Sequence, residues 1–184
     1  MAERKQEILQ TAIEMIADEG YASLTMRALA RASGMKLGAL QYHFRTTDDL
    51  WRELVAYIAA SYQRAFTQLA PGRSPTLREI VLFVLDDTAG ESLLGDQLWP
   101  QLWAMQQVEP LVSDLVEDIY DGYVALLEDA LATAGSTGPR ADALCLMSLL
   151  EGTTIFMSKG RRWEADGRAV RMRILQWVDR DFGE

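Results

Sequence analysis

Residues 24–44 read LTMRALARASGMKLGALQYHF, and this stretch decides how the N-terminal part of the chain folds. Thr25 is a residue type that caps helix N-termini, because its hydroxyl accepts a hydrogen bond from a backbone N–H one turn inside the helix. Gly34 predicts a tight turn, since glycine adopts positive φ at little cost. The pattern therefore predicts two short helices joined by a turn, the second running from Leu37 to His43.

The faces of these two helices differ in character. Met26, Leu29 and Ala30 share an apolar face of the first helix, and Leu40 and Phe44, four residues apart, share the inward face of the second. The second helix leaves a set of small, polar and aromatic side chains facing outward: Lys36, Gly38, Ala39, Gln41, Tyr42 and His43. This pattern is typical of a helix-turn-helix, whose second helix enters the major groove of DNA. The alternative is a helical hairpin in an ordinary bundle, with its cations on a solvated face.

The distribution of charge favours the DNA-binding interpretation. Residues 20–47 contain Arg27, Arg31, Lys36 and Arg45 and no Asp or Glu. The whole chain has 18 Lys and Arg against 27 Asp and Glu, a net charge of −9. Residues 1–47 carry six basic and five acidic side chains, so the remaining 12 basic and 22 acidic residues give the rest of the chain −10. Lysine and arginine supply the sequence-independent part of DNA affinity by neutralising phosphates, whereas an acidic body is repelled.

Residues 4–58 as a whole resemble the tetracycline-repressor (TetR) family of bacterial transcription regulators. The resemblance rests on an amphipathic first helix ending in EGY, followed by LTMRALA, by GALQYHF and by a new helix opened by TTDDL. This ordered set is far more specific than the bare helix-turn-helix spacing. The rest of the chain contains no motif of comparable specificity.

The resemblance implies contacts with double-stranded operator DNA by ten residues: Thr25, Arg27, Lys36, Leu37, Gly38, Ala39, Gln41, Tyr42, His43 and Thr47. Thr25 and Arg27 open the first of the two helices and meet phosphate or a base edge. Tyr42 and His43 match an aromatic pair that the family sets against the phosphate backbone. Backbone N–H groups at Thr46 and Thr47 can also meet a phosphate.

Three positions depart from the pattern of the family. These differences bear on which operator sequence is bound, and not on DNA binding itself. Lys36 stands where a capping Ser or Thr is usual, so a positive charge replaces a hydroxyl. Thr47 stands where the family often has lysine, which removes one charged phosphate contact. Gln41 stands where an aromatic residue is common, and a glutamine at this place can pair with adenine.

Composition limits the other classes of function. The chain of 184 residues has few prolines and no persistent strand-like alternation, which predicts an all-α fold. His43 is the only histidine and Cys145 the only cysteine, so we expect no intrachain disulfide, no multi-histidine metal site and no cofactor. The N-terminus lacks a signal-peptide pattern, and no apolar run approaches the roughly 20 residues of a spanning helix, so we expect a cytoplasmic protein without a membrane partner.

The predicted organisation is a helix-turn-helix DNA-binding head over residues 1–47 and a helical ligand-binding and dimerisation body over residues 48–184, about nine helices in all. The helices outside the pair already described are expected at about 4–19, 46–69, 75–88, 110–134, 139–158 and 166–181, with one or two short helices over 91–107. Pro110 and Pro139 each fit the first turn of a helix. The helix that begins near residue 46 is long enough to link head and body.

The last two predicted helices indicate a homodimer. The helix over 139–158 contains LCLMSLL and is apolar nearly all round, and the helix over 166–181 carries a second apolar stripe. A chain of this size cannot easily bury both within one protomer, so we expect them to pack against a second copy as a four-helix bundle. The family resemblance implies the same two-fold dimer. In the alternative, the two helices simply close the core of a monomer.

A small-molecule effector site is expected in the body, lined by aromatic side chains and a carboxylate: Phe83, Trp99, Trp103, Tyr120, Tyr123, Glu151 and Phe156. Such a set suits a cationic, lipophilic ligand through cation–π attraction, although aromatic residues at helical spacing are more often core. The sequence thus indicates a dimeric repressor of a palindromic operator, released by an effector of unknown identity. The alternative is an all-α carrier or enzyme without DNA binding, although no catalytic cluster supports it.

Overall fold

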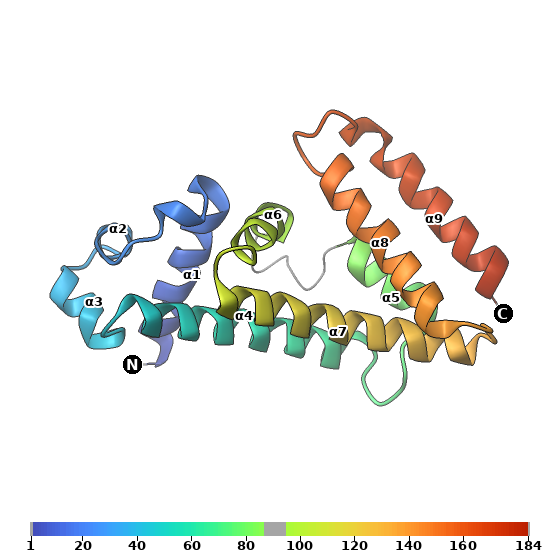
Figure 1. Cartoon of the computed structure of the whole chain (residues 1–184), viewed down its shortest axis with the longest axis horizontal. Coiled ribbons are helices and arrows are strands. Elements are labelled where there is room, and N and C mark those ends of the chain that lie inside the picture. Colours follow the sequence, from blue (N-terminus) through green and yellow to red (C-terminus); the bar gives the residue numbers. More distant parts are fainter. Residues whose placement is uncertain (1, 87–94, 184) are drawn as a thin grey trace. The chain divides into compact units, whose positions relative to one another are not determined.

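The computed structural model describes residues 2–86 and 95–183, and within these ranges every regular element is a helix (Figure 1). The elements are, in chain order, α1 (Ala2–Glu19), η1 (Tyr21–Ser23), α2 (Met26–Ala32), α3 (Leu37–His43), α4 (Thr47–Leu69), α5 (Leu77–Leu85), α6 (Gly95–Met105), α7 (Pro110–Thr133), α8 (Pro139–Met157), η3 (Glu164–Asp166) and α9 (Gly167–Phe182). The prediction of an all-α fold is confirmed.

The chain divides into two compact units. The first comprises Met1–Gln63 and Gly90–Glu117, and the second comprises Arg64–Ala89 and Asp118–Glu184. Helices α4 and α7 each contribute residues to both units. The boundary predicted after residue 47 divides the chain by expected function, DNA binding before it and ligand binding and dimerisation after it, and not by compact unit. It stays a prediction.

The core of the first unit is built on regularly spaced apolar side chains. Helix α1 buries one stripe made of Ile8, Leu9, Ala12, Ile13 and Ile16, as its sequence periodicity predicts. Helix α4 contributes Leu50, Leu54 and Ile58 at intervals of four, and α6 contributes Leu98, Leu102 and Met105. Helices α1 and α6 pack together within this unit.

The second unit packs α5, α8 and α9 against one another. Helix α5 is buried through Ile80, Val81 and Phe83, and α9 through Ile174, Leu175 and Val178. Helix α8 buries only one of its apolar faces, through Ala143, Leu146, Met147 and Leu150. Two exposed ion pairs tie α5 and the residue after it to α9: Arg78 to Asp179 at 2.5 Å, and Arg171 to Asp86.

Most helix boundaries follow the predicted ones, but α5 is shorter than the expected helix over 75–88. It begins at Leu77 because Thr76 is the N-cap residue, and its last residue is Leu85. Residues 87 and 88 lie outside the described part of the chain, as do residues 91–94 of the segment predicted over 91–107. The described part of that segment forms the single helix α6.

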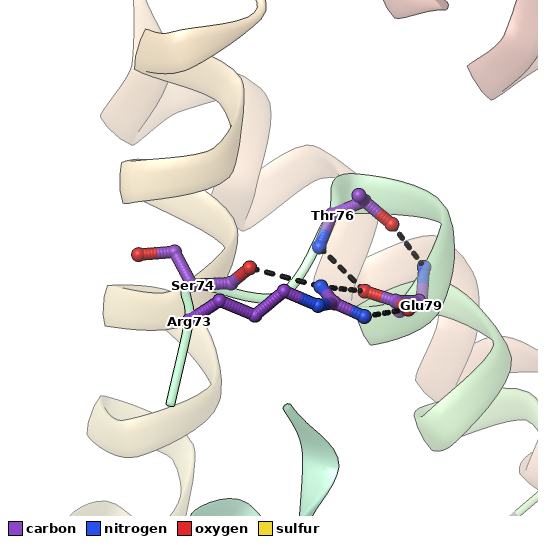
Figure 2. Close-up of polar contacts among 4 residues, drawn as sticks. All are labelled: Arg73, Ser74, Thr76 and Glu79. Carbon is purple, nitrogen blue, oxygen red and sulfur yellow. Dashed lines mark hydrogen bonds and ion pairs between the residues drawn. The ribbon is translucent and has the colours of Figure 1, made fainter. Parts of the chain in front are cut away.

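The start of α5 is a capping box reinforced by an ion pair (Figure 2). The Thr76 hydroxyl accepts a hydrogen bond from the Glu79 backbone N–H at 3.2 Å, and the Glu79 carboxylate accepts one from the Thr76 backbone N–H at 2.9 Å. Arg73 donates to both oxygens of the same carboxylate at 2.7 and 2.5 Å. The Arg73 hydrogen bonds, followed by the Thr76 backbone bond, lower the pKa of Glu79 from 4.5 to about 2.

Acid should therefore weaken this capping box. Because the pKa of Glu79 is lower in the folded chain, its contribution to stability is complete above pH 4.5 and is lost as the pH falls towards 2. We expect Glu79→Gln to lower the melting temperature at neutral pH, and to reduce the loss of stability between pH 4.5 and 2. Thermal unfolding followed by circular dichroism measures the melting temperature at each pH. Glu14→Gln, at an exposed position of α1, is the control. An identical acid profile for wild type and Glu79→Gln contradicts the assignment.

Candidate nucleic-acid interface

The turn between α2 and α3 is organised by local hydrogen bonds. The Thr25 hydroxyl accepts from the Ala28 backbone N–H at 3.1 Å, which makes Thr25 the N-cap of α2 as predicted. Gly34 has φ +67°, and the Met35 N–H donates to the Ala30 carbonyl at 2.8 Å. A side chain with a Cβ rarely adopts this φ, so glycine is required at the turn.

Helix α3 is anchored to the core by one face. Leu40 is fully buried and Phe44, its C-cap residue, is 1% exposed. These two residues fix which side of α3 faces the protein, because they lie four positions apart. The opposite side of the helix therefore faces solvent.

The predicted DNA-contacting residues lie on this solvent side or beside it. Eight are exposed and two, Leu37 and His43, are half-buried; the exposed ones are Thr25, Arg27, Lys36, Gly38, Ala39, Gln41, Tyr42 and Thr47. Tyr42 is 74% exposed and meets the His43 ring edge-on at 5.7 Å between centroids. Such an exposed aromatic ring on a helix is unusual for a side chain with only a packing role.

Gly38 lies on this surface, and packing within the fold does not require a glycine there. Its φ lies outside the left-handed region, and a Cβ added there would meet no atom within 4 Å. Because no neighbouring atom requires the small size of glycine here, packing within the described chain gives no reason for a glycine at this position.

Lys36 occupies the N-cap position of α3, and its role in phosphate contact stays a prediction. Lys36 is the N-cap residue, has extended backbone angles and makes no side-chain capping bond. Its ammonium group is therefore available for an anion. At the next helix, Thr46 and Asp49 form the reciprocal bonds of a capping box at 3.0 and 3.1 Å, so α4 starts at Thr47 with its first turn on the surface.

Two basic residues of α1 contact the elements that carry this surface. The sequence analysis did not single them out. Arg4 Nη2 donates to the Ser33 carbonyl, in the turn between α2 and α3, at 2.9 Å. Lys5 Nζ lies 2.7 Å from a Glu53 carboxylate oxygen on α4 and 5.5 Å from the centre of the Phe44 ring. The partners are 29 to 48 positions away in the sequence, so no local motif could identify them.

We expect Arg4 to act as a positioning residue. Arg4→Ala should weaken DNA binding several-fold by loosening the turn, without changing the slope of log affinity against log salt concentration. A phosphate-contacting arginine behaves differently, because its loss reduces that slope by about 1 per contact. Fluorescence anisotropy across a salt series distinguishes the two, with Arg31→Ala on the exposed face of α2 as comparison. A reduced slope for Arg4→Ala would assign it to the phosphate contacts.

The predicted effector-site residues fall into separate groups. Trp99 and Trp103 belong to the first unit, with ring centroids 6.2 Å apart, and the Tyr62 ring lies 5.6 Å from Trp99. The other five belong to the second unit: Phe83, Tyr120, Tyr123, Glu151 and Phe156.

Within the second unit, Phe83 and Tyr123 come together while Phe156 does not join them. Phe83 and Tyr123 lie 6.1 Å apart, with Phe66 at 5.9 and 4.8 Å from them. Phe66 was not among the predicted residues, although it follows Tyr62 by four positions on α4. Phe156 is 52% exposed and contacts Trp163. Whether these groups bind a ligand stays a prediction.

The described residues offer little for other chemistry. None of them forms a group of three or more His, Cys, Asp or Glu that could hold a metal ion. Nor does any helix in the described ranges have both the length and the apolar character needed to cross a bilayer.

The part of the chain that contains α2 and α3 is similar to known proteins. Residues 8–54 match the model of the bacterial regulatory proteins of the tetR family. This N-terminal region is of the TetR-family type. The match runs from residue 8 of α1 through α2 and α3 into the first part of α4, and so it includes every predicted DNA-contacting residue.

Relatives of the chain are described as regulators of transcription. It is 31% identical over 97 residues to the HTH-type transcriptional regulator AcrR of Shigella flexneri, covering 48% of this chain and 43% of that protein. It is also 31% identical over 67 residues to the HTH-type transcriptional repressor KstR2 of Mycolicibacterium smegmatis, covering 34% and 33%. The chain thus spans about half the length or less of these relatives. They are regulators of transcription and not enzymes.

Solved structures share the fold over the whole chain. A protein from Saccharomonospora viridis in complex with choline superimposes with a TM-score of 0.80, at 21% identity and with 100% of both chains covered. A TetR-family protein from Rhodococcus sp. gives a TM-score of 0.73 at 23% identity, covering 96% of this chain and 97% of that one. At this identity the likeness concerns the fold alone.

Proposed function

We propose that this chain is a TetR-family transcriptional repressor that binds a palindromic operator as a homodimer and is released by a small-molecule effector. The observation that carries the proposal is the solvent-facing surface of α2 and α3, which is basic, free of acidic residues and present on an otherwise acidic chain. We further propose that residues 1–47 act as the DNA-binding head and residues 48–184 as the ligand-binding and dimerisation body, in the cytoplasm.

In this proposal α3 lies in the major groove. Gln41 is the side chain best suited to read a base edge, because a glutamine amide can make paired hydrogen bonds to adenine. Gly38 and Ala39 let the helix backbone approach the base pairs closely. The cations and hydroxyls around them contact phosphates, which fixes the register of the helix without reading sequence.

Dimerisation would supply the second recognition helix of the DNA interface. Four residues on the outward face of α8 are large, apolar and exposed: Leu144, Leu149, Ile155 and Phe156. Met172 on α9 is also 51% exposed. Such a patch on one subunit favours burial against a second copy. Two recognition helices about one turn of DNA apart, roughly 34–36 Å, would then read a palindrome.

Control by an effector requires that the ligand prefer the conformation that does not bind DNA. Helix α4 is the covalent route for such control, because it begins three residues after α3 and ends in the second unit. A displacement of α4 would change the separation of the two recognition helices in the dimer.

The DNA-binding proposal is tested by fluorescence anisotropy with labelled DNA from the region upstream of the gene. We expect nanomolar-range binding at low salt, with affinity falling about 10³-fold or more between 50 and 200 mM salt if six or more phosphates are contacted. Unlabelled DNA of unrelated sequence serves as competitor. An all-α carrier or enzyme would show no retention of DNA even at low salt, and that result would overturn the proposal.

For the effector we propose a small organic cation, with choline as the first compound to test. The support is the aromatic character of the predicted lining residues and the choline complex of the Saccharomonospora viridis protein. Titration of tryptophan fluorescence with choline, and its effect on operator binding, test this class. An isosteric neutral alcohol is the control; equal responses to both would exclude cation recognition.

A further inference from the structure

The connection between α8 and α9 is a basic region on an acidic part of the chain. Residues 159–168, here called the hairpin tip, carry four exposed cations and two exposed carboxylates, a net charge of +2: Lys159, Arg161, Arg162, Glu164, Asp166 and Arg168. Residues 48–184 have 12 basic and 22 acidic side chains in all, so without the hairpin tip they have 8 and 20, a net charge of −12. The hairpin tip therefore reverses the sign of its surroundings.

The cations of the hairpin tip are not neutralised by the described part of the chain. Elsewhere in the second unit, five arginines each form an ion pair with a carboxylate: Arg73, Arg78, Arg140, Arg171 and Arg180. None of the four cations of the hairpin tip has such a partner among the described residues. Their charge is therefore available to an anion outside the chain.

The Glu164 carboxylate holds the backbone of the hairpin tip and does not pair with a cation. It accepts a hydrogen bond from the Gly160 N–H at 2.7 Å. The Arg161 N–H donates to the Ser158 carbonyl at 3.0 Å, and the Glu164 N–H donates to the Arg161 carbonyl at 3.2 Å. These bonds close the connection into a compact turn. Glu164 thus lowers the net charge of the hairpin tip but leaves the side-chain donors of its cations unused.

The local fold gives no reason for a cation at position 168. Arg168 lies in the first turn of α9, which has no acidic residue. The positive end of the helix macrodipole favours a carboxylate there and disfavours a cation. Arg162 lies 5.8 Å from the centre of the Trp163 ring, an arrangement in which a guanidinium can still donate its N–H groups to a phosphate.

We infer that the hairpin tip is a second contact surface for double-stranded DNA, which it meets through phosphates and without reading sequence. The inference rests on the proposed DNA binding and adds a contact outside residues 1–47. Three of the four cations are arginines, whose planar donor groups suit phosphate oxygens. DNA presents its phosphates at close spacing, so neighbouring cations can each neutralise one and raise the affinity for any sequence.

An anionic membrane fits the hairpin tip less well than DNA. A membrane-bound segment inserts aromatic or aliphatic side chains between lipids. The Trp163 ring is 49% exposed, but it already meets Phe156 edge-on at 5.9 Å and lies beside Arg162. The surface therefore offers charge more than it offers apolar groups that are free to insert.

Neutralising the hairpin tip tests the contact. The variant with Lys159→Gln, Arg161→Gln and Arg168→Gln, here called the tip variant, keeps Arg162 beside Trp163. We expect the loss of at least one phosphate contact per subunit of the dimer. The slope of log affinity against log salt concentration should then fall by about 2 or more, and affinity at about 50 mM salt should fall about tenfold or more. Fluorescence anisotropy of the full chain over a salt series measures both.

The loss should be equal for operator DNA and for a duplex of unrelated sequence, because phosphate contacts carry no sequence information. The matched control removes three exposed arginines of the same unit that have carboxylate partners: Arg78→Gln, Arg140→Gln and Arg180→Gln. It changes the net charge equally, and exposed ion pairs contribute little to stability. Its slope and affinity should match the wild type, and circular dichroism checks that both variants are folded. An equal fall in both variants would assign the effect to net charge and overturn the inference.

Two other partners of the hairpin tip would give different results. Sedimentation equilibrium compares the oligomeric state of the wild type and the tip variant. A tip variant that dissociates where the wild type is a dimer would assign the cations to a subunit contact. Retention of the wild type, but not of the tip variant, by phosphatidylglycerol vesicles, together with unchanged DNA binding, would assign them to a membrane. Either result overturns the inference.

A combined variant separates the inference from the proposed function. In a chain that carries Arg27→Ala and Tyr42→Ala, we expect residual binding to unrelated DNA at low salt, and the three tip substitutions should lower it a further tenfold or more. A wild type that binds no DNA at any salt concentration would remove both the proposed function and the second contact. Operator binding by the wild type, with unchanged affinity and slope in the tip variant, would leave the proposed function intact and reject only the second contact.

Discussion

Arg27→Ala combined with Tyr42→Ala is expected to lower operator affinity about 1000-fold while leaving the fold and the dimer unchanged. Both side chains are exposed, and neither contributes to the buried core. A two-fold dimer loses each contact twice, so four contacts worth about 1 kcal/mol apiece account for the expected change. The salt dependence should also fall by about 2 in slope, because two arginine–phosphate contacts are lost.

Fluorescence anisotropy over a salt series measures both effects, and circular dichroism confirms that the variant is folded. Arg173→Ala on α9 is the control, since it removes an exposed arginine from another part of the chain. An operator affinity unchanged by the double substitution would refute the assigned surface of α2 and α3. It would leave the all-α fold untouched.

Phe44→Ala should produce the largest loss of stability among substitutions in this region. Phe44 is 1% exposed, closes the inward face of α3 and lies under the Lys5 ammonium group. Removing a buried phenylalanine ring typically costs about 3–5 kcal/mol, because the cavity left behind only partly collapses. Since Leu40 and Phe44 together hold α3, operator binding should be lost along with stability.

Tyr42→Ala is the matched control for Phe44→Ala. Its ring lies two positions earlier on the same helix but is 74% exposed, so we expect a change in unfolding free energy within about 0.5 kcal/mol. Urea denaturation at pH 7, followed by circular dichroism, compares the two variants. Equal destabilisation by both substitutions would mean that α3 is not oriented as described.

Several features of the fold were predictable because their causes lie within a few residues of one another. Thr25 caps α2 and Gly34 turns the chain, and Pro110 and Pro139 begin α7 and α8 as their sequence positions indicated. Each of these depends on hydrogen bonds or steric limits that span at most five positions. The outward face of α3 follows for the same reason, because two buried residues four apart leave only one side for solvent.

Helix α5 shows the limit of such local reasoning even at short range. A helix was expected from about residue 75, but it begins at Leu77 because the Thr76 hydroxyl and the Glu79 carboxylate together satisfy the first free N–H groups. The sequence analysis did not identify this capping box, which sets the first residue of the helix.

Contacts between distant segments were beyond what the amino-acid order alone determines. Arg4 reaches the Ser33 carbonyl, and Phe66 joins Phe83 and Tyr123, only because packing brings separate helices together. Helix α8 is apolar on nearly every side, so its periodicity does not say which face is buried within the chain. Its packing against α5 and α9 made that choice, and left the opposite face for the second copy that we propose.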